Sequence, residues 1–273
     1  MTATTPPDLQ AGTHRLEFSG GRVHLMGVLN LSPESKNTPT VATDSEAAVS
    51  IADAHRRNGA SVIDVGAQSS HFDNAELSPD EELNRLGDTV RRLLDEGFVV
   101  SIDTWKPAVV AGMVDLGVSI INDTGGLQNP EMVEVVASAE VAAVVMYLEG
   151  ETPLEVGAIE LEGSLAGQMV DRLGERVRNL ADKGITEVVV DPGIGISYQG
   201  DRSLYNQHQV DVIRRLADFR ALGRPVLLPV PRKTELAPTL ALATLALEHG
   251  ADILRVHDVE AVAGIARMMG RML

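Results

Sequence analysis

The sequence predicts a single α/β domain, a (β/α)₈ TIM barrel, and three observations lead to this fold class. Eight short apolar runs recur along the 273 residues, their starts lie 20 to 46 residues apart, and helical patterns fill the gaps between them. The runs are continuous and rich in β-branched residues, as in parallel strands that are covered on both faces. Eight strands close such a barrel, although spacing alone leaves a doubly wound open sheet as an alternative. The runs cover residues 23–29, 61–65, 98–102, 118–121, 141–146, 187–190, 225–228 and 253–256.

The helices between these runs are predicted from their ends. A first helix should begin after Thr43 and Asp44 and stop at Gly59, because a small polar residue caps the start and a glycine ends the last turn. A second should begin at Ser78, which is followed by proline and three acidic residues, and should end at Gly97. Further helices are expected from about Pro107, Pro130, Ser164, Ser203, Glu235 and Val259, and the tail 261–273 forms the last of them.

The domain organisation expected from the sequence is simple. Residues 19–273 should form one barrel domain, and residues 1–18 should form a short disordered leader, since they lack the charged and apolar regions of a signal peptide. No run approaches the roughly 18 apolar residues that a membrane span requires. The chain has no cysteine, so disulfides, thiolate metal sites and a thiol nucleophile are excluded. We therefore expect a cytoplasmic protein with no membrane association.

The charge balance narrows the class of partner. There are 39 acidic and 23 basic residues, which give a formal charge of −16. Binding to nucleic acid or to an anionic membrane needs basic patches, so neither partner is expected. An anionic small-molecule substrate would have to be held by a few cations placed close to it.

Polar residues follow the predicted strands at the point where each one ends. In a barrel of this kind the carboxyl ends of all strands converge on one face, where the active sites of such enzymes lie. One aspartate or asparagine could simply cap the next helix, but polar residues at the ends of all eight predicted strands favour an active site. The residues are Asn30, Ser69 and Ser70, Asp103 and Thr104, Asn122 and Asp123, Met146 and Tyr147, Asp191, Arg232 and Lys233, and Arg255, His257 and Asp258.

These side chains fall into two chemical groups. Asp103, Asn122 and Asp191 offer acceptors, which suit a flat heterocycle whose edge carries adjacent N–H groups. Lys233, Arg255 and His257 offer positive charge or donors, which suit phosphate. Asn30 supplies a neutral oxygen that could bind Mg²⁺ already carrying phosphates. The face therefore predicts a phosphate ester of a heterocycle as substrate.

The same residues lie in motifs that, in order and over nearly the whole chain, resemble those of the dihydropteroate synthase family. The motifs are Met26-Gly-Val-Leu-Asn30, Ile63-Asp-Val-Gly66, Ser101-Ile-Asp-Thr104, Ile121-Asn-Asp-Thr-Gly125, Asp191-Pro-Gly-Ile-Gly195, Arg232-Lys233 and Arg255-Val-His-Asp-Val259. The resemblance implies a TIM barrel, usually a homodimer, that joins 6-hydroxymethyl-7,8-dihydropterin pyrophosphate to p-aminobenzoate and releases pyrophosphate in folate biosynthesis.

The resemblance also implies a role for each matching residue. Asp103, Asn122 and Asp191 would hold the edge of the pterin, Met146 would line its pocket, and Lys233 would contact the ring. Arg255 and His257 would hold pyrophosphate, and Asn30 would do so through Mg²⁺. Ser70 would contribute a hydroxyl to substrate binding from the second loop. Lys233, Arg255, His257 and Asp103 would be the catalytic set.

The departures from the family pattern cluster in the loops. The first loop, 32–40, lacks the family's phenylalanine and glycine pair, and the second, 67–73, lacks its arginine and proline. The family's Met-His is Met146-Tyr147, and its Gly-x-Ser before Arg-Lys is 229–231, Pro-Val-Pro. Two alternatives therefore stay open. One is a pterin-binding paralogue with a different acceptor or no synthase activity. The other is a methyltetrahydrofolate-type methyltransferase, which has no pyrophosphate for Lys233, Arg255 and His257 to hold.

Overall fold

The computed structural model of the chain describes residues 5–32, 40–69, 75–156, 165–196, 202–231 and 235–273. Eight of its strands form one parallel sheet in the order β8-β7-β6-β5-β4-β3-β10-β9. A bridge between Val190 and Val226 joins the two ends of this order, so the sheet closes on itself. Closure confirms the predicted barrel and excludes the doubly wound sheet. The barrel strands are β3 (His24–Asn30), β4 (Ala60–Gly66), β5 (Val100–Asp103), β6 (Ile120–Asp123), β7 (Ala142–Met146), β8 (Val188–Asp191), β9 (Leu227–Pro229) and β10 (Ile253–Val256).

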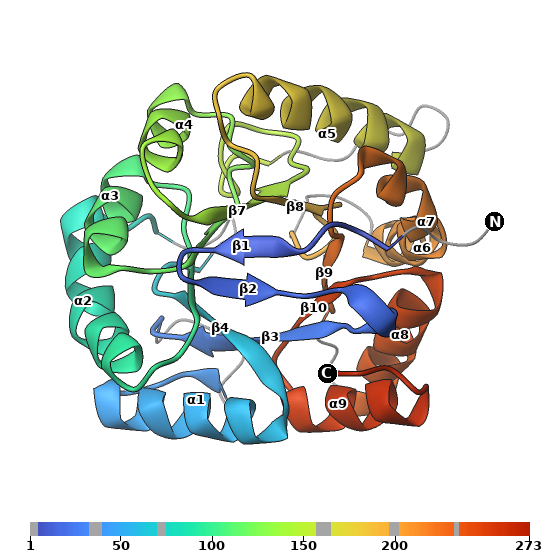
Figure 1. Cartoon of the computed structure of the whole chain (residues 1–273), viewed down its shortest axis with the longest axis horizontal. Coiled ribbons are helices and arrows are strands. Elements are labelled where there is room, and N and C mark those ends of the chain that lie inside the picture. Colours follow the sequence, from blue (N-terminus) through green and yellow to red (C-terminus); the bar gives the residue numbers. More distant parts are fainter. Residues whose placement is uncertain (1–4, 33–39, 70–74, 157–164, 197–201, 232–234) are drawn as a thin grey trace.

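Helices surround the strands as an outer ring (Figure 1). Each of the predicted runs became a strand, and each predicted helix start lies within about two residues of an observed one. The helices are α1 (Ser45–Asn58), α2 (Pro79–Asp95), α3 (Pro107–Leu116), α4 (Pro130–Ala137), α5 (Leu165–Ala181), α6 (Arg202–Arg214), α7 (Leu216–Phe219), α8 (Leu236–His249) and α9 (Val259–Met268), with 3₁₀ turns at Ser19–Gly21 and Arg220–Leu222. The last helix ends at Met268, whereas the sequence predicted that it would continue to the end of the chain at Leu273.

The helix ends show why these segments fold locally. The Asp44 side chain accepts from the amide of Ala47 at the start of α1, and Gly59 ends that helix in the left-handed conformation at φ 110°. Ser78 and Glu81 form a reciprocal capping box at the start of α2, with Pro79 in the first position. These contacts satisfy backbone groups that a helix terminus would otherwise leave unpaired.

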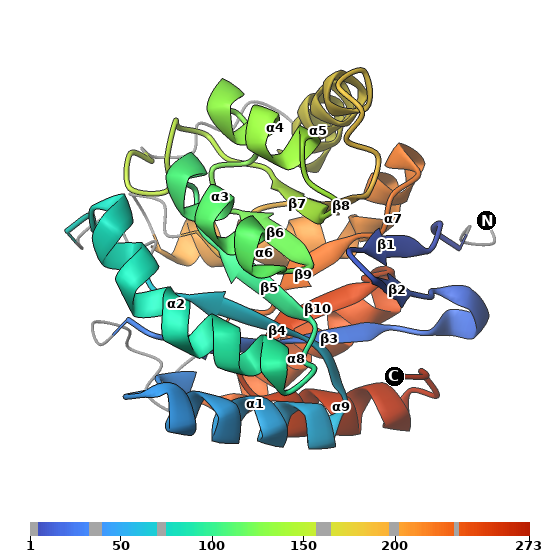
Figure 2. The same cartoon turned by 60° about the vertical axis from the view of Figure 1, so that its left-hand side comes forward.

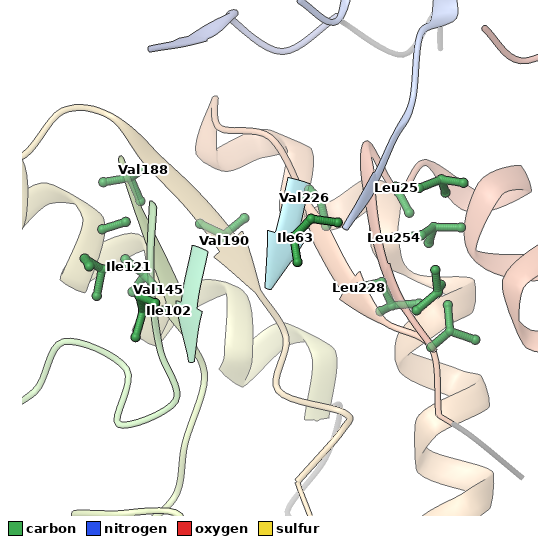
Figure 3. Close-up of a cluster of buried hydrophobic side chains, with 14 of the residues drawn as sticks. Leu25, Ile63, Ile102, Ile121, Val145, Val188, Val190, Val226, Leu228 and Leu254 are labelled. Carbon is green, nitrogen blue, oxygen red and sulfur yellow. The ribbon is translucent and has the colours of Figure 1, made fainter. Parts of the chain in front are cut away.

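Side chains alternate along each strand between the helices and the barrel interior. The outward set packs against the helices and forms the main hydrophobic core; ten residues of this core are labelled in Figure 3, among them Ile63, Ile102 and Ile121. The inward set begins, at the amino ends of the strands, with a second apolar cluster that includes Met26, Val62 and Ile120. This lower layer closes the barrel below the polar residues described next.

The chain before residue 19 differs from the expected disordered leader. Two short strands, β1 (Leu9–Ala11) and β2 (His14–Leu16), pair as an antiparallel hairpin that lies across the barrel (Figures 1 and 2). Leu9, Leu16 and Phe18 are buried in the lower apolar cluster. The expectation of disorder over residues 1–18 is therefore wrong for residues 5–18, because covering the open lower end of the barrel removes apolar surface from water. Within the described residues, no helix has the length and apolar character needed to cross a membrane.

Candidate active site at the carboxyl end of the barrel

The strand register places the predicted acceptors side by side inside the barrel. Asp103 at the end of β5 pairs in register with Asn122 of β6, and Met146 of β7 pairs with Asp191 of β8. These four residues alternate with the outward-facing core residues, so they face the interior above the lower apolar cluster. Asn122 and Asp191 are each only 2% exposed. The strands thus bring together the residues that the sequence analysis assigned to a heterocycle.

A fully buried carboxylate lies at the centre of this group, on β4. Asp64 accepts hydrogen bonds from the Ser101 hydroxyl at 2.6 Å, the Asn122 amide at 3.1 Å and Arg255 Nε at 2.6 Å. Sequence reasoning did not single out Asp64, although a charged residue within an apolar strand was a usable signal, since buried charges are almost always paired. Asp64 fixes the side-chain amide of Asn122 and the guanidinium of Arg255 at once.

Arg255 of β10 reaches past β3 to contact carboxylates of β4 and β5. Its Nη2 lies 2.5 Å from Asp103 Oδ2, while its Nε contacts Asp64. Burial lowers the pKa of Arg255, but the two carboxylates raise it overall, so the guanidinium stays charged. Arg255 is one of the three residues predicted to bind an anion, and its charge is balanced here by the carboxylates of Asp64 and Asp103.

The pocket carboxylates have strongly shifted pKa values. Burial raises the pKa of Asp103 to about 7, although the Arg255 guanidinium opposes this shift. Burial raises the pKa of Asp191 to about 7 as well, while the Gly193 amide and Arg255 lower it. Groups that exchange protons near neutral pH are typical of functional sites.

The turn after β8 shapes the position of Asp191. Asp191 Oδ1 accepts from the Gly193 amide at 2.7 Å, and Gly193 has φ 73°. A Cβ atom at position 193 would lie 2.1 Å from the Tyr147 carbonyl oxygen, so only glycine fits. The Asp-Pro-Gly motif is therefore needed to turn the chain closely over β7.

Asn30 and His257 lie together at the mouth of the barrel. Asn30 ends β3 and His257 directly follows β10, and both side chains contact the hydroxyl of Thr40. Among the described residues no group of three or more histidine, aspartate or glutamate side chains is arranged to hold a metal ion.

Two predicted site residues, Ser70 and Lys233, lie outside the described residues. The described ends of the second loop are held by Gln68 and Lys106. The Gln68 amide accepts from the Leu77 backbone N–H at 2.6 Å and donates to the Ala75 carbonyl at 3.2 Å. Lys106 donates to the Leu77 carbonyl and to buried Glu82, each at 2.7 Å. A buried ion pair therefore anchors one end of the predicted loop.

One departure from the family pattern lies away from the pocket, and another lies beside it. Tyr147 belongs to the outward-facing core, and its hydroxyl donates to Glu149. Pro229, in contrast, pairs in register with Arg255, and its ring is 3.1 Å from the place where a Cβ atom of Gly195 would be. Pro229 therefore lies beside Arg255 and close to the backbone of Gly195.

Known proteins match the chain over nearly its whole length. A family model described as pterin binding enzyme matches residues 26–257. Dihydropteroate synthase of Bacillus subtilis (strain 168) is 32% identical over 265 residues, which is 91% of this chain and 88% of that protein. Dihydropteroate synthase of Burkholderia cenocepacia, solved as a complex with 7,8-dihydropteroate, has a TM-score of 0.83 at 28% identity and covers 98% of this chain and 96% of that one. Dihydropteroate synthase of Thermus thermophilus, solved in complex with 4-aminobenzoate, has a TM-score of 0.79 at 29% identity. The match covers 96% of this chain and 100% of that one. The matched length, the closed barrel and the carboxylate pocket together show that the chain belongs to the pterin-binding enzyme family of the dihydropteroate synthases.

Proposed function

We propose that the protein is a dihydropteroate synthase, a transferase of folate biosynthesis. It joins 6-hydroxymethyl-7,8-dihydropterin pyrophosphate to p-aminobenzoate and forms 7,8-dihydropteroate and pyrophosphate. The observation that carries this proposal is the ring of acceptors formed by Asp103, Asn122 and Asp191 around Arg255. The relatives named dihydropteroate synthase and the complexes with dihydropteroate and 4-aminobenzoate support the same substrates.

The chain's own residues act by binding and electrostatics. Asp191 and Asp103 accept N–H groups of the pterin edge, and Asn122, held by Asp64, can both donate and accept. The p-aminobenzoate nitrogen forms a bond to the pterin methylene carbon while the bond from that carbon to pyrophosphate breaks, and the nitrogen then loses a proton. Carboxylates beside the methylene favour its developing positive charge, and Arg255 and His257 favour the negative charge of the leaving group. No protein nucleophile takes part.

We further propose that Mg²⁺ assists at Asn30. The fit rests on the chemistry of the donor: Asn30 offers one neutral amide oxygen at the barrel mouth, near His257, and such an oxygen suits a hard cation that already carries phosphates. When bound with pyrophosphate, Mg²⁺ would stabilise the negative charge of the leaving group. Lys233 would contact the pterin ring and Ser70 the substrate, as the resemblance implies.

We also propose that the protein works in the cytoplasm as a homodimer. A cysteine-free chain fits the cytoplasm, and the family resemblance supports a homodimer. The substrates are small molecules, and neither nucleic acid nor membrane is proposed as a partner.

One observation favours a second candidate, a pterin-binding paralogue with a different acceptor. Pro229 stands where the family motif begins with glycine, and it lies beside Arg255 and close to Gly195. A proline ring in place of glycine at this position would change which amine reaches the methylene without removing the acceptors for the pterin.

The deciding experiment supplies the pterin pyrophosphate, p-aminobenzoate and Mg²⁺ and measures dihydropteroate and pyrophosphate. Production of both supports the synthase. No turnover, with pterin binding still measured by calorimetry, supports the paralogue. As a test of the pocket, Asp191→Asn should weaken pterin binding roughly 10- to 100-fold, because it removes a charged acceptor. The matched control Asp88→Asn changes an exposed pair with Arg91 and should leave binding unchanged. Equal pterin affinity in both variants would refute the assignment of the pocket.

A further inference from the structure

A buried hydroxyl connects the two residues proposed to hold the leaving group. Thr40 is 2% exposed. Its Oγ1 lies 3.1 Å from Asn30 Nδ2 and 2.9 Å from His257 Nδ1. The three residues come from β3, from the segment that leads into α1 and from the end of β10, so the contact joins parts of the chain 217 residues apart.

Backbone pairing holds Thr40 in this position. The next residue, Val41, forms a parallel bridge with Asn30, and the amide of Ala42 donates to the Asn30 carbonyl at 2.9 Å. The segment 40–42 is thus paired with the end of β3. The backbone pairing therefore holds the Thr40 hydroxyl in a fixed place at the barrel mouth.

The chemistry of the three groups sets their orientation. The Asn30 side-chain nitrogen can only donate, so the hydroxyl oxygen accepts from it. The hydroxyl can donate its proton to His257 Nδ1, and in that arrangement Nδ1 is the acceptor and the imidazole proton is on Nε2. The Asn30 amide is held with its nitrogen toward Thr40, and its oxygen is at the opposite side of the amide group.

We propose that Thr40 is a positioning residue for pyrophosphate binding. It acts by fixing the amide orientation of Asn30 and the Nε2–H tautomer of His257. This inference rests on the proposed function of the barrel mouth. A fixed oxygen on Asn30 suits a hard cation, and a fixed N–H on His257 suits a phosphate oxygen. Neither group then has to reorient when the substrate arrives, which lowers the entropic cost of binding.

The test compares Thr40→Val, which keeps the branched shape without the hydroxyl, with Thr40→Ser, which keeps the hydroxyl. Inorganic pyrophosphate with Mg²⁺ is titrated into each folded variant by calorimetry, and 6-hydroxymethylpterin, which carries no pyrophosphate, is titrated separately. We expect Thr40→Val to weaken pyrophosphate binding about tenfold, as for the loss of a hydrogen bond to a buried polar group, and Thr40→Ser to stay within about threefold. Pterin affinity should be equal in all three proteins.

A second measurement follows the histidine directly. The ¹⁵N shifts of the His257 ring, assigned by comparison with His257→Gln, report which nitrogen carries the proton. The wild type and Thr40→Ser should show the Nε2–H form, and Thr40→Val should show a mixture of tautomers. An Nδ1–H form in the wild type would overturn the proposal, as would equal pyrophosphate affinity in Thr40→Val and the wild type. If the wild type binds pterin but no pyrophosphate, the anion site of the proposed function fails, and the role of Thr40 fails with it.

Discussion

Asp64→Asn is the change that tests the organisation of the pocket most directly. The side chain is fully buried and accepts from Ser101, Asn122 and Arg255. An asparagine of the same shape can turn its nitrogen toward the Ser101 hydroxyl, which can rotate to accept, and keep its oxygen toward Asn122 and Arg255. The geometry then survives and the negative charge is lost.

The expected cost follows from that change. Removing one partner of a buried pair costs about 3–5 kcal/mol, and hydrogen bonds to charged groups contribute about 1.5–3 kcal/mol. Asp103 still pairs with Arg255 in the variant, so we place the loss in the free energy of unfolding near the lower end, at about 3 kcal/mol. At about 2–4 °C per kcal/mol, the Tm should fall by roughly 6–12 °C.

The assay is thermal unfolding of Asp64→Asn, Ser101→Ala and Asp88→Asn, with pterin titration of each folded protein. Ser101→Ala removes one neutral donor and should cost about 1 kcal/mol. Asp88→Asn removes an exposed pair with Arg91 and should cost less than about 1 kcal/mol. A Tm of Asp64→Asn within about 2 °C of the wild type, less than 1 kcal/mol of lost stability, would refute the view that Asp64 balances Arg255.

Four further outcomes are expected. Lys106→Met should lower the free energy of unfolding by about 3–5 kcal/mol in urea denaturation, because Glu82 stays buried without its partner, and Lys106→Met with Glu82→Met should recover most of the loss. Pterin affinity measured by calorimetry should increase between pH 6 and 8, since Asp103 and Asp191, with pKa values of about 7, ionise in that interval and become better acceptors; a flat profile contradicts this. Because both pKa values are above the ordinary value of 3.8, the same groups should make the protein without ligand less stable as the pH rises from about 4 to 7. Phe18→Ala should cost about 3–5 kcal/mol in thermal unfolding if the hairpin covers the barrel, and a loss below about 1 kcal/mol would show that it does not.

The barrel could be predicted because its signals are local. A strand such as β7 is buried on both faces and is therefore a continuous apolar run, and α2 carries its own capping box and proline. The hairpin gave no such signal. Its strands, Leu9–Ala11 and His14–Leu16, have three residues each, which is too short for an alternating pattern to stand out.

The site could be predicted only in part, because only some of its residues have a local signal in the sequence. Asp103, Asn122 and Asp191 end their strands, so barrel geometry alone brings them together. Asp64 interacts with residues 37, 58 and 191 positions away, and Thr40 is a single hydroxyl in a loop. The importance of these two residues lies in contacts between distant segments, which periodicity and spacing do not contain.

An acidic protein can bind an anionic substrate only if the charges close to the binding site permit it. Three carboxylates, Asp64, Asp103 and Asp191, face the interior close to the guanidinium of Arg255, so this group is itself acidic when all are ionised. The raised pKa values of Asp103 and Asp191 reduce that excess near neutral pH. A charge of −16 spread over the whole chain acts over distances at which salt screens it, with a Debye length of about 8 Å. On the proposed function, recognition of the anion would be decided within a few ångströms of Arg255 and His257, which contact Asp64 and Thr40 respectively.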